Sequence, residues 1–340
     1  MVALAGVRLP KGTMEQVTQK KLALFAGRPS EALAKSVCDE LGIELGEANI
    51  AEFANGEIHC RFSESVRGSD VFILNVHSAW DDGSINDALI EHLVMVDAAK
   101  RASAKRITVV APFYGYGRQD RKAAGREPIT AKLIANMFRT AGASRLVSID
   151  LHSGQIQGFF DGPVDHLTAM PVLVDYLKSL GTEDLVVVSP DAGRVKVAER
   201  YANALGASLA IVHKRRVRDK KNTVEAKDVV GDVAGKVCVL IDDMIDTGGT
   251  IVAAAEQLVE KGAKSVFAAT THPVLSGPAV DRLKNSSIEK VIVTDTLPLG
   301  PEKQFDKIVV LSIAGILARA IEAVFMDTTV SEIFDGKNQM

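Results

Sequence analysis

The chain has 340 residues, of which 47% are hydrophobic and 5% aromatic, and a formal net charge of -3. This length is sufficient for two domains, and the small negative charge gives no general reason to expect nucleic-acid binding. The three cysteines (Cys38, Cys60 and Cys238) lack metal-ligand spacing, and their odd number favours a reducing cytoplasm. No apolar run reaches membrane-spanning length, and residues 1–20 lack the hydrophobic segment of a signal peptide. We therefore expect a cytoplasmic globular protein in which residues 1–21 form an N-terminal extension.

Short apolar runs alternate with helical patterns in both halves of the chain. In the first half we predict strands at residues 22–25, 71–74, 107–110 and 146–150, and helices at residues 30–41 and 85–99. In the second half the matching strands lie at residues 185–188, 237–241, 266–269 and 291–295, and the matching helices at residues 194–205 and 251–261. Because element order and turn residues recur together, the pattern predicts two similar α/β domains, each a mainly parallel sheet flanked by helices.

The boundary between the two domains is expected near residue 167, after the turn residues Gly162 and Pro163. This divides the chain into an N-terminal domain at 22–167 and a C-terminal domain at 168–324, with the tail 325–340 returning to the first domain. In open parallel sheets, ligands bind at the carboxyl ends of the strands. We therefore expect a binding site between the domains.

The most specific motif of the chain follows the strand predicted at residues 237–241. Asp242 and Asp243 end the apolar run, and residues 246–250 (Asp-Thr-Gly-Gly-Thr) open a helix that Thr247 or Thr250 can cap. Paired carboxylates accept hydrogen bonds from sugar hydroxyls or bind a divalent cation, and a helix N-terminus binds anions. The motif therefore favours a phosphorylated sugar, although a plain structural turn with solvated acidic residues has a similar composition.

In the first half, residues 77–84 stand at the place of the acidic motif and lack its Asp-Thr-Gly-Gly-Thr sequence. What the first half has instead is a basic segment after another predicted strand. Four cations lie within the nine residues from Arg118 to Arg126, next to glycines and after a predicted strand end. Such a segment suits a polyphosphate. A solvated basic loop is the alternative.

Polar residues also follow two other predicted strands. Asp150 and His152 lie at one strand end, where the histidine can serve a metal, a phosphate or only the fold. Asp191 lies at another, as a cation ligand or as the N-cap of the next helix.

The densest run of charge covers residues 211–222. Surface hairpins and nucleic-acid arms have this composition. A third interpretation is a flap that brings Lys214 and Arg216 over a bound triphosphate, excludes water and neutralises charge in the transition state.

With these motifs in view, residues 22–334 resemble the ribose-phosphate pyrophosphokinase (phosphoribosyl-pyrophosphate synthetase) family, in its phosphate-activated class. The motif at 246–250 is similar to the phosphoribosyl-pyrophosphate loop of the type I phosphoribosyltransferase fold, and it lacks the Gly-Lys-Ser/Thr of a Walker A loop. Further matching motifs lie at residues 53–57, 65–68, 128–132, 155–160 and 230–233. The resemblance implies two tandem type I phosphoribosyltransferase-like domains, the first for ATP and the second for ribose 5-phosphate.

The resemblance also implies an activity and a role for each matched residue. The activity is transfer of the diphosphoryl group of Mg-ATP to the anomeric hydroxyl of ribose 5-phosphate, which gives AMP and 5-phosphoribosyl 1-pyrophosphate for nucleotide, histidine and tryptophan biosynthesis. The matched positions are Lys214 and Arg216 for catalysis, Arg118 and Gln119 for ATP, Phe53, Asn55 and Glu57 for adenine from a neighbouring subunit, and His152 and Asp191 for Mg²⁺. For the sugar they are Asp242 and Asp243 at the hydroxyls, and Asp246, Thr247, Gly248, Gly249 and Thr250 at the 5-phosphate.

The resemblance further implies a homo-oligomer, which in this family is a hexamer. It also implies that phosphate and ADP act as regulators at the contacts between subunits. The positions that fall near this regulatory site are Arg126, Gln157, Ser331 and Phe334. Position 154, which varies among relatives, is Gly here.

Three other functions predict different sequence features. A base phosphoribosyltransferase shares the sugar-phosphate loop but needs only one core domain, which the duplicated first half argues against. A non-catalytic regulatory homologue tends to carry insertions in the flap, and none is evident around Lys214 and Arg216. A nucleic-acid binder is disfavoured by the net charge, and we expect no membrane partner.

Overall fold

The computed structural model describes residues 7–8, 14–15, 20–80, 83–218 and 223–334. For residues 7–8, 14–15, 214–218 and 223–227 it describes the backbone alone. Most of the expected N-terminal extension lies outside the described residues, apart from the short antiparallel pair β1 (Val7–Arg8) and β2 (Met14–Glu15).

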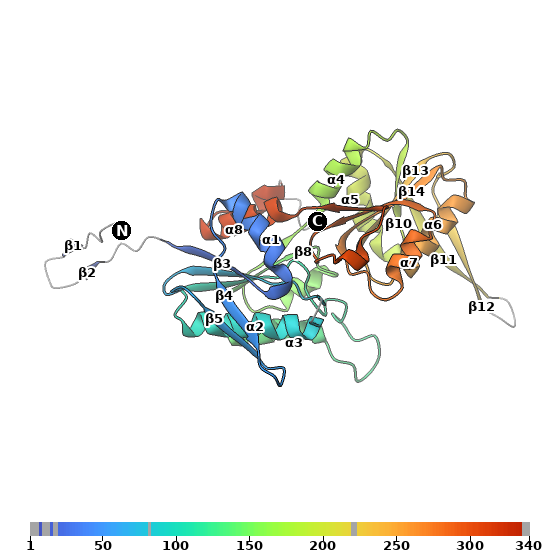
Figure 1. Ribbon diagram of the computed structural model, residues 1–340. Coiled ribbons are helices and arrows are strands. Elements are labelled where there is room, and N and C mark those ends of the chain that lie inside the picture. The colour runs from blue at the N-terminus through green and yellow to red at the C-terminus, as the bar shows by residue number, and fades with distance from the viewer. Residues whose placement is uncertain (1–6, 9–13, 16–19, 81–82, 219–222, 335–340) are drawn as a thin grey trace.

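The first half is built on a five-stranded parallel sheet with a helix layer on each face (Figure 1). The strand order is β3 (Leu22–Ala26), β6 (Asp70–Leu74), β7 (Arg106–Val110), β8 (Arg145–Ile149) and β9 (Val164–Leu167). The helices of this half are η1 (Arg28–Ser30), α1 (Glu31–Leu41), α2 (Ile85–Arg101), α3 (Thr130–Ala141) and η2 (Gly154–Gly158). A separate antiparallel hairpin, β4 (Ala48–Glu52) and β5 (Ile58–Phe62), projects from the body of this half.

The second half is built on a seven-stranded sheet in which only the pair β11–β12 is antiparallel. The strand order is β12 (Thr223–Val230), β11 (Ser208–Arg218), β10 (Leu185–Ser189), β13 (Val237–Ile245), β14 (Ser265–Pro273), β15 (Ile288–Thr294) and β16 (Ile308–Leu311). The helices from residue 170 onwards are α4 (Met170–Ser179), η3 (Ala192–Arg194), α5 (Val195–Leu205), α6 (Gly249–Glu260), α7 (Ala279–Lys284), η4 (Pro301–Lys303), α8 (Ala314–Phe325) and η5 (Val330–Phe334).

The two sheets confirm the internal duplication and the α/β class. Strands β3, β6, β7 and β8 follow one another in the first sheet as β10, β13, β14 and β15 do in the second. Several element ends differ from the prediction by a few residues, and the end of β13 is the difference that affects the site. Strand β13 continues past Ile241 to Ile245, because Asp242 and Met244 pair with Thr270 and His272 of the equally long β14. The acidic pair therefore belongs to the strand and not to the turn that follows it.

The last helix of each half packs on the opposite half. Helix α4 follows β9 of the first half but lies against α5, and α8 follows β16 of the second half but lies against α1 (Figure 1). One hydrophobic core therefore runs through both halves. Its buried members include Leu24, Val37, Val147, Leu173, Val187, Val239, Ile313, Leu317 and Ile321.

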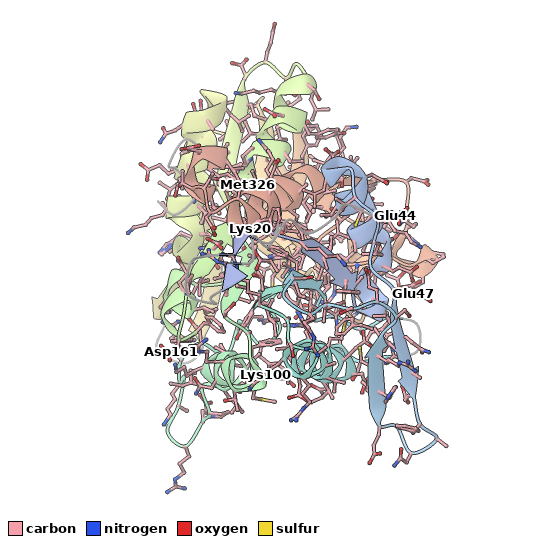
Figure 2. All side chains as sticks on the ribbon, turned by 90° about the vertical axis from the view of Figure 1, so that its left-hand side faces the viewer. Lys20, Glu44, Glu47, Lys100, Asp161 and Met326 are labelled. Carbon is pink, nitrogen blue, oxygen red and sulfur yellow. The ribbon has the colours of Figure 1, made fainter. Side chains whose placement is uncertain are left out.

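The chain that follows α8 is tied to the first half by charge. Lys20 Nζ donates to the carbonyl oxygen of Phe325 at 2.9 Å and forms an ion pair with Asp327. Arg106 Nη1 contacts Asp327 at 2.6 Å, and Arg106 also pairs with Asp70. Figure 2 shows Lys20 beside Met326, which lies between these partners in the chain. In the described part of the chain, no helix combines the length and apolar character that crossing a membrane requires.

We predict that Leu317→Ala lowers the free energy of unfolding by about 2–5 kcal/mol, because Leu317 is fully buried in the core shared by both halves. Urea unfolding measures this loss. The control is Arg319→Ala, an exposed position on the same helix, which should change stability little. An equal effect of the two variants would contradict the shared core.

Candidate active site

The carboxyl ends of β8 and β14 meet in a buried hydrogen-bond network between the two halves. Asp150 Oδ2 accepts hydrogen bonds from the Thr271 hydroxyl at 2.6 Å and from the Ala169 amide at 2.9 Å. His272 Nε2 donates to the carbonyl oxygens of Ile149 and Asp150 at 3.1 and 3.2 Å. The strand ends of the two sheets therefore face each other, which is the arrangement that a site between domains requires.

His272 can hold this position because its ring is neutral. Burial lowers the pKa of its imidazole. Since Nε2 donates to β8, Nδ1 has no proton and accepts a hydrogen bond from the Thr296 hydroxyl at 3.0 Å. Both ring nitrogens are thus satisfied.

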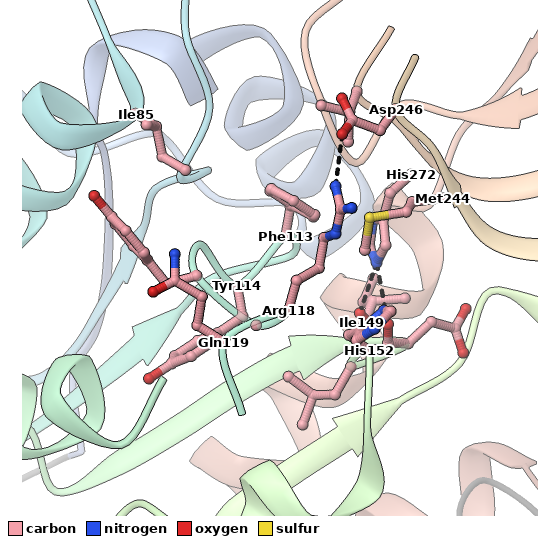
Figure 3. A pocket seen from close by; sticks show the side chains of 15 residues that line it. Ile85, Phe113, Tyr114, Arg118, Gln119, Ile149, His152, Met244, Asp246 and His272 are labelled. Atoms are coloured by element: carbon pink, nitrogen blue, oxygen red, sulfur yellow. Dashed lines mark hydrogen bonds and ion pairs between the residues drawn. The ribbon is translucent and has the colours of Figure 1, made fainter. Parts of the chain in front are cut away.

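Three adjoining cavities lie around these strand ends. The largest, of about 530 Å³, is lined from both halves of the chain (Figure 3). Its walls are mainly apolar or aromatic, with a few polar side chains among them. The lining residues used below are Phe113, Tyr114, Arg118, Gln119, His152, Met244, Asp246 and His272.

The second cavity, of about 210 Å³, brings the acidic motif together with the other strand-end residues. It shares Arg118, His152, Met244 and Asp246 with the largest cavity, so the two adjoin along this wall. Its other lining residues are Asp191, Arg194, Asp242, Asp243, Ile245, Thr247, Gly248, Thr250 and Ile251.

The turn between β13 and α6 leaves its amide groups free of side-chain caps. The N-cap residue of α6 is Gly248, at a φ of 75°, which an L side chain adopts only with strain. No side chain caps this helix, so the expectation that Thr247 or Thr250 does so is wrong. Arg282 Nη1 donates to the Thr247 carbonyl oxygen at 2.9 Å and braces the turn. The uncapped N–H groups are suited to bind an anion.

An ion pair joins the two motifs across the gap between the halves. Arg118 Nη1 lies 2.6 Å from Asp246 Oδ2, and Figure 3 shows this contact at the rim of the largest cavity. The neighbouring Gln119 accepts a hydrogen bond from the Thr130 hydroxyl through Oε1. Of the four cations in the basic segment, Arg118 is the one that lines these cavities.

His152 is oriented by Asp243. Its Nδ1 lies 2.8 Å from Asp243 Oδ2, and the Arg194 guanidinium lies 2.5 Å from Asp243 Oδ1. Burial opposes ionisation of Asp243, but the His152 hydrogen bond and the Arg194 charge outweigh it and lower the pKa of this carboxyl. Arg194 Nη2 also lies 3.0 Å from His152 Nδ1. With its proton on Nδ1, His152 donates to the ionised Asp243 and keeps the lone pair of Nε2 free to accept or to bind a cation.

Asp242 differs from its neighbour. Burial, together with the adjacent Asp243 carboxylate, raises the pKa of Asp242, and Arg194 opposes this shift. Its Oδ1 accepts the Asp243 amide at 2.9 Å and lies 3.2 Å from Arg194 Nε.

Asp191 caps a helix, which is one of the two roles that the sequence analysis considered for it. Its Oδ1 accepts hydrogen bonds from the amides of Gly193 and Arg194, so it is the N-cap of η3. It also lines the second cavity, with His152. In the described residues, no three His, Cys, Asp or Glu side chains form a ready-made metal site. The donor set fits Mg²⁺, which typically uses one or two protein ligands and completes its shell with water and substrate phosphates.

Two buried histidines, His77 and His92, hold the chain just before the basic segment. The sequence did not predict this pair. The Gly115 amide donates to His77 Nδ1 at 3.1 Å, and His77 Nε2 lies 3.1 Å from His92 Nδ1. His92 Nε2 in turn lies 3.1 Å from the carbonyl oxygen of Ile73. Burial lowers the pKa of His77 to about 3, so the chain of bonds joins neutral rings and fixes the start of the segment on the β6 strand.

Two further groups of expected site residues lie on hairpins. Phe53, Asn55 and Glu57 are exposed at the tip of the β4–β5 hairpin, where Asn55 Oδ1 accepts the Glu57 amide at 3.2 Å. Lys214 and Arg216 lie on β11, paired in register with Lys227 and Glu225, but their side chains are outside the described residues. Figure 1 shows the β11–β12 hairpin extending away from the second half.

The four positions expected at a regulatory site come from separate elements. Arg126 is exposed in the loop before α3, and Gln157 Nε2 donates to the Gly154 carbonyl oxygen at 3.1 Å. Ser331 and Phe334 lie in η5, where Phe334 is buried in the shared core. In the described residues, no hydrogen bond or ion pair joins η5 to Arg126 or Gln157.

Comparisons with known proteins agree with this geometry. Residues 22–142 match the model of the N-terminal domain of ribose phosphate pyrophosphokinase, and residues 221–335 match that of the phosphoribosyl synthetase-associated domain. Ribose-phosphate pyrophosphokinase of Streptomyces coelicolor is 54% identical over 318 residues, covering 93% of this chain and 97% of that protein. The Bacillus caldolyticus protein of the same name is 51% identical, with 93% and 99% covered.

A solved structure is similar over nearly the whole fold. The crystal structure of phosphoribosylpyrophosphate synthetase from Mycobacterium smegmatis is 53% identical, with a TM-score of 0.85, and the match covers 91% of this chain and 100% of that one. The fold and the paired cavities therefore define an enzyme of the phosphoribosyl synthetase class. The chain belongs to the ribose-phosphate pyrophosphokinase family.

We predict that Thr271→Val lowers the free energy of unfolding by about 1–3 kcal/mol, because it removes a hydrogen bond to the partly buried Asp150 carboxylate without changing the shape of the side chain. Thr140→Val is the matched control, since its hydroxyl is exposed on α3 and bonds only within that helix. Thermal and urea unfolding of both variants measure the difference. A Thr271→Val protein as stable as the control would contradict the role of this contact.

Proposed function

We propose that this chain transfers the diphosphoryl group of Mg-ATP to the anomeric hydroxyl of ribose 5-phosphate, giving 5-phosphoribosyl 1-pyrophosphate and AMP. One observation carries the proposal. The cavity that contains the acidic motif and the uncapped helix N-terminus shares a wall with the larger cavity that contains Arg118 and Gln119. A sugar phosphate and a nucleotide bound in these two cavities would meet at that wall.

The smaller cavity would hold the sugar. Asp242 and Asp243 accept the ribose hydroxyls, and the 5-phosphate binds at the start of α6 through residues 246–250. The free amide groups after Gly248 support the phosphate assignment. The depth of the carboxylates, 19% and 7% exposed, supports the hydroxyl assignment, because buried acceptors discriminate strongly against a missing hydroxyl.

The larger cavity would hold the nucleotide, with Arg118 and Gln119 at its phosphates. Phe53, Asn55 and Glu57 are exposed on a projecting hairpin and line neither of the two cavities described above. They would frame the adenine bound to a neighbouring copy of the chain, so each complete site needs two subunits. We propose a homo-oligomer, a hexamer, on this basis and on family resemblance.

Magnesium would bind between His152 Nε2 and Asp191, with phosphate oxygens and water as its other ligands. When bound, the ion neutralises the phosphates and polarises them toward attack. Asp243 orients His152 for this role through Nδ1.

Lys214 and Arg216 would act from the β11–β12 hairpin. The strand pairing holds this hairpin as a long projecting unit that can move as a flap. Closure would bring both cations to the transferring group. The anomeric oxygen then bonds to the β-phosphorus, the bond from that phosphorus to the oxygen bridging the α-phosphate breaks, and AMP leaves with that oxygen. The hydroxyl proton passes to solvent, and no covalent enzyme intermediate forms. In-line positioning and cancellation of charge supply the catalysis.

We further propose the division at 22–167 and 168–324 with the tail on the first domain, a cytoplasmic location, and regulation by phosphate and ADP near Arg126, Gln157, Ser331 and Phe334. The ion pairs of Asp327 with Lys20 and Arg106 support the return of the tail.

The test is AMP release by the purified chain from ATP, with ribose 5-phosphate and then with other pentose phosphates. We expect AMP only when ATP, ribose 5-phosphate and Mg²⁺ are all present, and none after chelation with EDTA until Mg²⁺ is restored. Formation of 5-phosphoribosyl 1-pyrophosphate should match AMP one to one. ADP in place of AMP, or no dependence on the sugar phosphate, would refute the proposed function.

Replacement of Lys214 with Ala should lower kcat for AMP formation by about 10³-fold or more, since comparable cations over a transferring phosphoryl group contribute that much. KM for ribose 5-phosphate should change little, because the residues proposed to hold the sugar lie on β13 and in the turn that follows it, and not on β11. The control is Lys178→Ala, an exposed lysine on α4. If AMP formation by the Lys214 variant equals that of the control, the catalytic flap must be abandoned.

A further inference from the structure

Arg194 lies between the two carboxylates of the acidic motif. It ends η3, and its side chain is only 17% exposed. Its Nη2 lies 2.5 Å from Asp243 Oδ1, and its Nε lies 3.2 Å from Asp242 Oδ1. A single guanidinium therefore spans both carboxylates. Only the planar fork of arginine offers two donors at this spacing; a lysine ammonium is a point charge.

The two carboxylates differ in how many of their oxygen atoms are already bonded. Both oxygens of Asp243 are engaged, Oδ1 by Arg194 and Oδ2 by His152. On Asp242, by contrast, the Arg194 contact and the Asp243 amide both fall on Oδ1. The Asp242 carboxylate is therefore held through Oδ1. Of the two carboxylates it is the better placed to accept a hydrogen bond from a sugar hydroxyl in the second cavity, which it lines.

Arg194 also stands between two cavities. The second cavity has a neighbour of about 200 Å³, lined from α5 and the β8–β9 region by residues that include His166, Arg200 and Tyr201. Both cavities are lined by Arg194, His152, Asp242 and Asp243. These four residues therefore form the partition between them, and Arg194 is the longest side chain in it.

We propose that Arg194 is a positioning residue for sugar recognition, which holds the Asp242 carboxylate toward the sugar and closes the rear of the sugar cavity. The inference rests on the proposed function and adds to it the device that sets sugar specificity. Without the guanidinium, the two adjacent carboxylates repel each other and turn apart, and the partition opens into the rear cavity. Arg194 acts through Asp242 and need not contact the reacting atoms.

The test compares Arg194→Ala and Arg194→Lys with wild type, using ribose 5-phosphate and 2-deoxyribose 5-phosphate as alternative acceptors. For Arg194→Ala we expect KM for ribose 5-phosphate to rise about 10-fold or more, with KM for ATP unchanged. The ratio of kcat/KM for ribose to that for 2-deoxyribose should fall by about 10-fold, as expected when one charge-assisted hydrogen bond to a hydroxyl is lost. The values for Arg194→Lys should lie between those of wild type and Arg194→Ala, because lysine keeps the positive charge but lacks the two parallel donors of the guanidinium.

Lys196→Ala, an exposed position two residues further along, is the matched control and should resemble wild type. Titration calorimetry of ribose 5-phosphate without nucleotide provides a readout that does not depend on turnover, and Arg194→Ala should weaken this binding by the same factor. If Arg194→Ala does not fold, Arg194→Lys alone decides the matter through the acceptor ratio.

An unchanged acceptor ratio in both Arg194 variants, or an equal rise in KM for ATP and for ribose 5-phosphate, would overturn the inference. If the proposed function itself is wrong, the result differs, because the wild-type protein then releases no AMP with ribose 5-phosphate.

Discussion

The site depends on the buried hydrogen bonds that hold the carboxyl end of β8 against the carboxyl end of β14. Asp150 has a φ of 38°, a conformation that costs a non-glycine residue roughly 1–3 kcal/mol. It is maintained because Thr271 and the Ala169 amide bind its carboxylate while His272 binds its carbonyl oxygen. This strained residue directly precedes Leu151 and His152, so the same bonds that join the halves also aim the histidine at the acidic motif. The largest cavity is lined by residues of both halves, so it exists only while these hydrogen bonds hold the two sheets in their relative positions.

Much of the fold could be predicted from local sequence signals. The apolar runs and the turn residues between them are properties of short segments. They located the central strands of both sheets and revealed the duplication, but they did not locate β4, β5, β9 or β16. The end of β13 was misplaced because Asp242 and Asp243 look like the end of a strand, whereas pairing with β14 extends it to Ile245. The absence of a threonine cap at α6 likewise depends on the backbone at Gly248, which places the hydroxyls of Thr247 and Thr250 away from a capping position.

The candidate site was predictable only in part, and for a physical reason. Asp242, Asp246 and Arg118 stand in motifs whose composition indicates their chemistry. Arg194, Thr271 and His272 do not, because their importance comes from contacts made across the chain; Arg194 meets a histidine that is 42 residues away in sequence. The buried histidines 77 and 92 are similar, since a histidine among apolar residues predicts nothing until its partners are known. The only local sign of Arg194 was its position three residues after Asp191.

The exchange of helices between the halves has a consequence for how the protein is made. Helix α1 packs against α8, yet about 270 residues separate them, so α8 leaves the ribosome long after α1. Until α8 has emerged, the side of α1 that it covers in the finished fold has no partner, so the apolar residues of α1 are less protected during synthesis than in the folded protein.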